Sequence, residues 1–177
     1  MALDTIRTLY SRHWWANRTL LDVAARLGED AVARQVGQQF SEPTLKRMFL
    51  HVYNVDELWL YRWRGVSPTP PKGGDVLREA EVAPTLAALG ERWVTLEREQ
   101  AAYLDGLQEG DLTRMIHYRL FSGKEYAQPL TLLLHHVTDH GTHHRSEIAT
   151  MLTMVSGSPP GTGLARFIAI RSGQDPA

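Results

Sequence analysis

Residues 129–155 read PLTLLLHHVTDHGTHHRSEIATMLTMV and form the longest stretch with helical periodicity near the end of the chain. Pro129 is favoured in the first turn of a helix, and the run SGSPPG at 156–161 ends the pattern. Successive helical residues advance by about 100°, so the apolar residues gather on one arc, which we expect to face a core. The arc contains Leu130, Leu133, Leu134, Val137, Ile148, Met151, Leu152 and Val155.

This stretch also holds five of the eight histidines of the chain. On helical geometry, His140 and His144 lie one turn apart at the edge of the apolar arc, where two imidazoles can bind one metal ion. His136 lies just outside the arc, whereas His143 and His135 point further toward solvent. The geometry therefore predicts two inward-facing histidines, one marginal one and two surface ones.

Three further segments show helical periodicity, and stretches rich in Gly and Pro separate them. A first helix is expected over 4–27, with Gly28 as its stop. A second is expected to open at 41–43, where Ser can cap and Pro is tolerated, and to end near Gly65. A third is expected over 84–104. Four amphipathic segments in one chain favour an all-α fold, an antiparallel-type four-helix bundle.

The connecting segments complete the predicted fold. Residues 65–82 are rich in Pro and Gly and predict a long crossover loop. Residues 115–126 are β-prone and predict a small hairpin or an extended loop before the last long helix. A short C-terminal helix is expected over 164–170. The length fits one domain, which we place at 1–172, followed by a polar tail at 173–177.

Composition limits the classes of function. The chain has 19 Lys plus Arg against 20 Asp plus Glu, a formal charge of −1, which argues against a nucleic-acid partner. No segment approaches the roughly 18 consecutive apolar residues of a membrane helix, and the start lacks a signal-peptide pattern. We therefore expect a cytoplasmic protein with no membrane partner. Cysteine is absent, which excludes thiol nucleophiles and Cys-ligated metals.

A third metal ligand is predicted on the second helix. His51 lies at the edge of the apolar arc of that helix, near its middle, as His140 and His144 do on the last helix. Mid-helix residues meet in a bundle whether the helices run parallel or antiparallel, so we predict a metal site of His51, His140 and His144. Its remaining positions would be open to water or substrate. The alternative for each histidine is a hydrogen-bonded core residue.

Three other side chains are candidates for catalytic roles. Glu147 lies one turn beyond the last ligand, where it can orient an imidazole or act on a bound water; the alternative is a surface carboxylate. Asn17 and His13 lie on the apolar face of the first helix and can reach the interior, where His13 can instead be a hydrogen-bonded core residue. Asp56 lies within an apolar arc and needs a partner; Arg145, Asn17 or a ligand imidazole are the candidates.

Three motifs resemble the DinB-like (DinB/YfiT) family of helical bundles. They are HWWANRTLL at 13–21, LKRMFLHVYNVDELW at 45–59 and LLLHHVTDHGTHHRSEI at 132–148. In that family one histidine of the second helix and an H-x-x-x-H pair of the last helix bind a divalent metal. The resemblance maps these ligands to the same three histidines. The chain departs from the family at Asp139, where Asn is frequent, and at Ser146, where Gly is frequent.

The resemblance also implies a function. Some DinB-like members resemble thiol S-transferases and isomerases that use mycothiol, bacillithiol or glutathione. We therefore expect a thiol S-transferase in detoxification or stress response, with Zn or Ni, or else Fe or Mn, as its metal. The thiol would be a cosubstrate, because the chain has no cysteine. A small-molecule substrate and a homodimer are expected. The alternatives are a metal-dependent hydrolase and a non-catalytic metal- or ligand-binding bundle.

Overall fold

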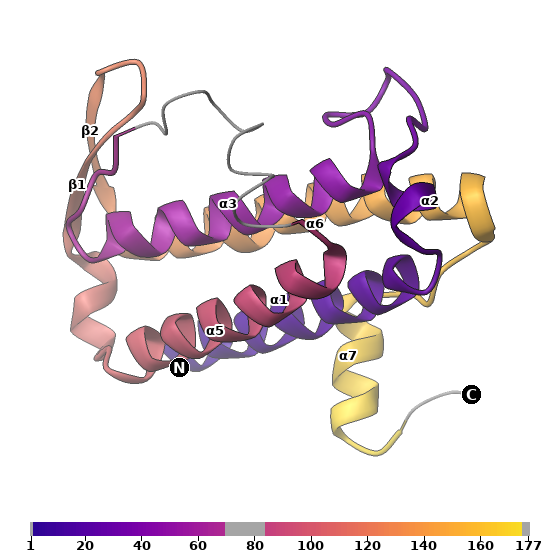
Figure 1. The fold of residues 1–177 in the computed structure, drawn as a ribbon. Coiled ribbons are helices and arrows are strands. Elements are labelled where there is room, and N and C mark those ends of the chain that lie inside the picture. The colour runs from indigo at the N-terminus through magenta and orange to yellow at the C-terminus, as the bar shows by residue number, and fades with distance from the viewer. Residues whose placement is uncertain (1, 70–83, 175–177) are drawn as a thin grey trace.

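A computed structural model describes residues 2–69 and 84–174 of the chain. The described residues are mostly helical, with one small hairpin (Figure 1). The long helices are α1 (Ala2–Ala25), α3 (Leu45–Trp63), α5 (Leu86–Asp105) and α6 (Leu130–Ser156). The shorter elements are α2 (Glu29–Ala33), the 3-10 helix η1 (Glu109–Thr113), β1 (Met115–Arg119), β2 (Glu125–Pro129) and α7 (Leu164–Arg171).

The four long helices pack in neighbouring pairs, with α1 and α3 each contacting both α5 and α6. Near the start of α1, Arg7 donates to the carbonyl of Leu104 at the end of α5, so these two helices are antiparallel. Tyr103 of α5 donates to the carbonyl of Trp63, the last residue of α3, so α3 and α5 run parallel. The expected antiparallel arrangement therefore fails for this pair. The end of α3 and the start of α5 therefore lie at opposite ends of this helix pair.

Threonine caps set the starts of two long helices. The side chain of Thr44 accepts the N–H of Arg47 at 3.1 Å, so α3 begins at Leu45 and not at the predicted 41–43. The side chain of Thr85 likewise accepts the N–H of Ala88 at 3.1 Å and starts α5. Each cap satisfies one of the backbone donors left free by a helix start.

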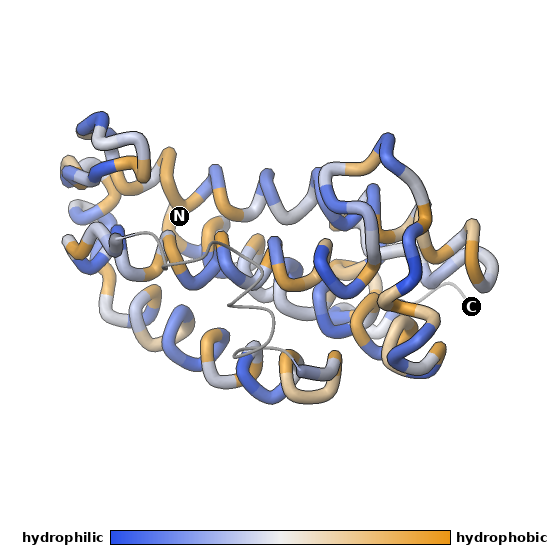
Figure 2. The backbone as a smooth tube through the Cα atoms, turned by 45° about the horizontal axis from the view of Figure 1, so that its top comes forward, coloured by the Kyte–Doolittle hydropathy of each residue, from blue (hydrophilic) through white to orange (hydrophobic). Residues whose placement is uncertain are grey.

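The predicted apolar arcs form the core between the four long helices. Figure 2 shows hydrophobic and hydrophilic segments alternating along each of them, as expected when one face of a helix is buried. Val155 is an exception, because it is 41% exposed in the last turn of α6, where residues 153–156 all face solvent. Buried members of the arcs include Ile6, Tyr10, Met48, Phe49, Trp59, Trp63, Leu89, Trp93, Leu134, Val137 and Met151.

The hairpin and α2 lie at opposite ends of this core, and α7 lies beside α1 (Figure 1). The predicted hairpin is present, with Tyr118 paired to Tyr126 and with Gly123 in the turn at φ 85°. The predicted C-terminal helix is present as α7, and its Phe167 ring lies 5.5 Å from that of Trp15 on α1. Most of the predicted crossover loop, and the last residues of the polar tail, lie outside the described residues. None of the helices in the described ranges has both the length and the apolar character required to span a bilayer.

Candidate metal centre

Three imidazoles from α3 and α6 meet where these helices pack together. Nε2 of His51 lies 3.2 Å from Nε2 of His140 and 3.2 Å from Nε2 of His144. The Nε2 atoms of His140 and His144 are 3.0 Å apart. His144 is buried and the other two are partly buried. The structure thus brings together the three histidines predicted from the sequence. Their Nε2 atoms form a nearly equilateral triangle, which we call the histidine triangle.

The triangle has the dimensions of a site for one metal ion. Imidazole nitrogens at Zn–N distances of about 2.0–2.1 Å lie about 3.3 Å apart around a tetrahedral ion, and about 2.9 Å apart on an octahedral face. The separations of 3.0–3.2 Å lie between these two values. Three nitrogen atoms that face one another cannot all be paired by hydrogen bonds among themselves. Each close N···N approach needs a proton or a metal ion between the two atoms. This cluster could therefore hold a metal ion.

Glu147 orients His144 and determines which of its nitrogens carries the proton. Its Oε2 accepts a hydrogen bond from Nδ1 of His144 at 2.7 Å, and its Oε1 accepts the N–H (2.8 Å) and the hydroxyl (3.0 Å) of Ser41. The lone pair of the neutral imidazole is then on Nε2, which faces the other two histidines. Burial raises the pKa of Glu147, but the hydrogen bonds from Ser41 and His144 outweigh it and lower the pKa overall.

His140 is held in the neutral form that metal ions bind. Burial, followed by the nearby imidazoles of His144 and His51, lowers the pKa of His140 to about 3. Its Nδ1 is buried and has no hydrogen-bond partner among the described residues. A neutral imidazole can bind a metal ion without first losing a proton.

The other α6 histidines lie outside the triangle, as helical geometry predicted. His135, His136 and His143 are exposed. The His136 ring lies 6.0 Å from that of His140 and 5.0 Å from that of Trp59, so it borders the site without joining it. Burial lowers the pKa of His136.

His13 and Asn17 lie elsewhere, in a buried polar group between the long helices that we call the interior cluster: His13, Asn17, Asp56, Trp93 and Arg145. Nη1 of Arg145 donates to Nδ1 of His13 at 2.9 Å and to Oδ1 of Asn17 at 2.7 Å. The proton of the neutral His13 ring is then on Nε2, which donates to Oδ2 of Asp56 at 2.9 Å. Trp93 donates to the same oxygen at 3.3 Å. These residues are at most 3% exposed.

Asp56 therefore has partners that the sequence analysis did not propose for it. The expected partners were Arg145, Asn17 or a ligand imidazole, whereas the bonds come from His13 and Trp93. The imidazole lies between the carboxylate and the guanidinium, which explains why Arg145 does not reach Asp56 directly. Trp93 was missed, although most buried indole N–H groups have an acceptor and this one could have indicated Asp56.

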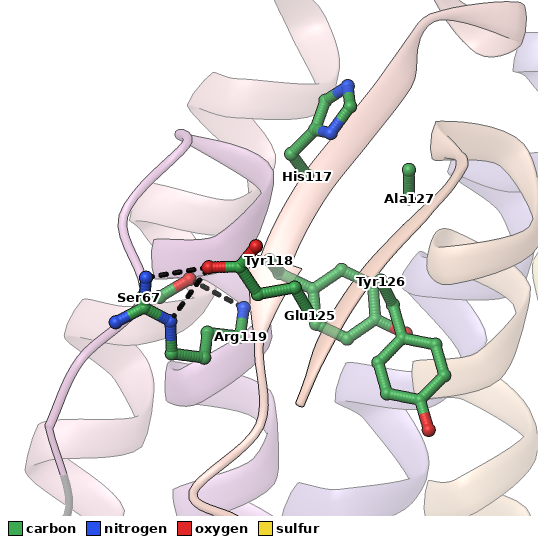
Figure 3. Close-up of a pocket in the computed structure, with 7 residues that line it drawn as sticks. All are labelled: Ser67, His117, Tyr118, Arg119, Glu125, Tyr126 and Ala127. Atoms are coloured by element: carbon green, nitrogen blue, oxygen red, sulfur yellow. Dashed lines mark hydrogen bonds and ion pairs between the residues drawn. The ribbon is translucent and has the colours of Figure 1, made fainter. Parts of the chain in front are cut away.

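A pocket of about 410 Å³ lies at the hairpin, where Ser67 and residues of β1 and β2 line it (Figure 3). Within it, Arg119 is paired with Glu125 at 2.7 Å and its backbone N–H donates to Ser67. The Tyr118 ring also lies 5.1 Å from the ring of Trp59, which contacts His136. A row of aromatic rings thus connects the wall of this pocket with the edge of the histidine triangle.

The fold and the site together define a mostly helical protein with a cluster of three histidines that could hold a metal ion. The chain belongs to the DinB family, whose sequence model matches residues 1–172. It is similar to a protein of Bacillus subtilis (strain 168) named Protein DinB. The two are 23% identical over 163 residues, which cover 90% of this chain and 92% of that protein.

Proposed function

We propose that this chain is a metal-dependent enzyme in which His51, His140 and His144 bind one divalent ion, Zn or Ni, within a four-helix bundle. The observation that carries the proposal is the mutual spacing of 3.0–3.2 Å among the three Nε2 atoms. Glu147 supports it, because it holds the Nδ1 proton of His144 and leaves the Nε2 lone pair free for the ion. Neutral imidazoles suit both metals.

The reaction we propose is transfer of a low-molecular-weight thiol to an electrophilic small molecule. The S–H bond breaks and its proton goes to solvent, the sulfur bonds to the electrophilic carbon, and the leaving group on that carbon, such as chloride, departs with the electron pair of its bond. A divalent ion held by neutral ligands keeps its full charge and, when bound, lowers the pKa of a thiol or water that joins it. The chain contains no cysteine, so the sulfur must come from a cosubstrate such as mycothiol, bacillithiol or glutathione. Hydrolysis would use the same histidines with water in place of the thiol, and a non-catalytic site would use them with neither.

Metal analysis tests the site. Protein purified without chelators should contain about one divalent ion per chain, and His51→Ala and His144→Ala should lose it, since two imidazoles remain where catalytic sites use three ligands. His135→Ala is the matched control, because His135 is an exposed histidine of the same helix. Wild type that stays metal-free after incubation with Zn²⁺ and Ni²⁺, or triad variants that retain the ion, would contradict the site.

Thiol titration tests the reaction. Cobalt-substituted protein, titrated without oxygen with each of the three thiols, should show a changed visible spectrum with at least one of them. That thiol should then be consumed when chlorodinitrobenzene is added. A spectrum unchanged by all three thiols contradicts S-transfer, and ester cleavage in the absence of thiol would indicate the hydrolase.

The proposal includes a homodimer, as the family resemblance implies, and a cytoplasmic location, as expected from the sequence. Sedimentation equilibrium should give twice the mass of the 20.0 kDa chain. A monomeric mass at micromolar concentration would contradict the dimer and would leave the metal site unaffected.

A further inference from the structure

One imidazole of the interior cluster joins both helices that supply the histidine triangle. His13, on α1, donates through Nε2 to Asp56 of α3 and accepts through Nδ1 from Arg145 of α6, each at 2.9 Å. Asp56 follows His51 on α3 by five residues, and Arg145 is adjacent to His144. The ring therefore lies between two points that are close along the chain to ligands on different helices.

On α6, two residues that lie between the ligands His140 and His144 contact either His13 or the guanidinium bonded to it. Arg145 also donates through Nη2 to Thr142 at 3.0 Å, so the turn between His140 and His144 is bound to the same guanidinium. Gly141 lies in that turn, and a Cβ there would be 2.7 Å from Nδ1 of His13. The absence of a side chain at Gly141 lets the imidazole pack directly against the helix backbone.

We propose that His13 is a positioning residue which, by bridging Asp56 and Arg145, sets the separation of α3 and α6 at which the three Nε2 atoms fit one metal ion. This inference rests on the proposed metal site and assigns His13 a role other than ligand or acid–base catalyst. Both of its ring nitrogens are bonded to protein groups, so it has no lone pair to offer an ion or a substrate.

The charges of the cluster favour a side chain with one donor and one acceptor at this position. Asp56 and Arg145 are 0% and 3% exposed, and each would be costly to bury alone. An imidazole with one acceptor and one donor nitrogen connects the two charges. Its Nδ1 accepts from the guanidinium, and its Nε2–H donates to the carboxylate. The bridge is thus directional and has a fixed length, whereas a purely apolar contact would let the two helices shift.

The test measures Zn²⁺ affinity by competition with a chromophoric chelator, using full-length wild type, His13→Ala and His13→Gln. We expect His13→Ala to weaken binding by about 10- to 100-fold, the usual effect of removing a group that orients metal ligands. His13→Gln should recover part of the loss, because its amide carries one donor and one acceptor. The visible spectrum of the Co²⁺-saturated protein should change in His13→Ala, since a shifted helix alters the ligand geometry.

Tyr10→Phe is the matched control. Tyr10 is buried on α1, one turn before His13, and its hydroxyl donates to the carbonyl of Leu134 on α6 at 3.1 Å. Its ring packs 5.9 Å from that of Trp63 on α3, a contact that phenylalanine keeps. This variant should lose stability but keep the wild-type affinity and Co²⁺ spectrum. Equal weakening in Tyr10→Phe and His13→Ala, or an unchanged affinity in folded His13→Ala, would overturn the inference. If His13→Ala does not fold, His13→Gln replaces it and should still weaken binding relative to wild type; an unchanged affinity in folded His13→Gln would then overturn the inference. Wild type that binds no Zn²⁺ contradicts the proposed function itself, whereas tight wild-type binding with unaffected variants contradicts only the role of His13.

Discussion

The histidine triangle and the interior cluster use the same residue type in opposite ways. In the triangle, the Nε2 atoms of His51, His140 and His144 face one another at 3.0–3.2 Å. In the interior cluster, His13 lies between an anion and a cation, Asp56 and Arg145. A histidine whose nitrogens converge on other nitrogens offers lone pairs, whereas one bonded on both sides offers none. The bonding partners of the ring, more than its burial, therefore indicate its role.

Adjacent residues of α6 belong to the two different regions. His144 and Arg145 are neighbours in sequence, and both are buried. The rotation of about 100° between successive helical residues places the first toward α3, in the triangle, and the second toward α1, in the interior cluster. We expect substitutions in the triangle to remove metal binding with little effect on folding of the metal-free chain, and substitutions in the interior cluster to affect folding first.

The largest effect is expected from Asp56→Ala. Removing the carboxylate leaves Arg145 buried without its counter-charge, which typically costs about 3–5 kcal/mol. Urea unfolding of the metal-free protein measures the loss. Asp139→Ala, which removes an exposed carboxylate from α6, should be nearly neutral. If Asp56→Ala lowered the free energy of unfolding as little as the control does, the contrast between the two regions would fail. The charges of Asp56 and Arg145 would then not stabilise one another.

A smaller loss is expected from Gly141→Ala. The new methyl group would lie closer than van der Waals contact to Cε1 of His13 and 2.7 Å from Nη1 of Arg145. Overpacking of this kind usually costs about 1–3 kcal/mol, and thermal unfolding measures it. Gly110→Ala, where a Cβ would meet no atom within 4 Å, controls for the change of residue type. Equal melting temperatures for the two variants would show that α6 can move away from His13.

The sequence predicted the triangle better than the interior cluster, for a physical reason. Helical periodicity places His140, His144 and His51 on the edges of apolar faces, so their approach follows once the two helices pack. The bond between His13 and Asp56 depends on how α1, α3 and α6 are oriented together, and periodicity does not encode helix direction. The antiparallel arrangement came from the favoured bundle architecture and not from periodicity, and it was wrong for α3 and α5, which are parallel.

Competing partners explain the misplaced helix start. Ser41 has the chemistry of an N-cap, but its N–H and hydroxyl both donate to Glu147, which is 106 residues away. Thr44 caps the helix in its place. Local preferences predicted that a polar cap would occur in this region, and a contact distant in sequence decided which residue forms it.

On the triangle side, Glu147→Gln should weaken Zn²⁺ binding by about tenfold, the lower end of the effect of losing a group that orients a metal ligand. A neutral amide offers one acceptor where the carboxylate accepts from both His144 and Ser41. Glu42 lies before the start of α3 and forms an ion pair with Arg47. Glu42→Gln removes this pair and should leave the Zn²⁺ affinity unchanged. Chelator competition measures both. A Glu147→Gln protein with wild-type affinity would show that the triangle is held by helix packing alone.

The smallest effect, and the one that depends on pH, is expected from Glu97→Gln. Glu97 is buried on α5 and paired with Arg18. Burial raises its pKa to about 7, with a further rise from Asp56 that the pairing with Arg18 opposes. The folded state therefore binds a proton that the unfolded state, with an ordinary carboxyl pKa of about 4.3, has already released between pH 5 and 7. The stability due to this proton is complete below that range and is lost as pH rises through 7.

Glutamine cannot titrate, so the stability of Glu97→Gln relative to wild type should increase by about 1 kcal/mol between pH 6 and pH 8. Paired unfolding curves at the two pH values measure the change, and other titrating groups cancel in the difference. Glu99→Gln, on the same helix but in an exposed pair with Arg64, should show no such change. A difference that stays constant with pH would mean that Glu97 remains charged beside Arg18. The buried charges of this region would then be fully compensated at neutral pH, and the contrast with the uncharged triangle would be sharper than proposed.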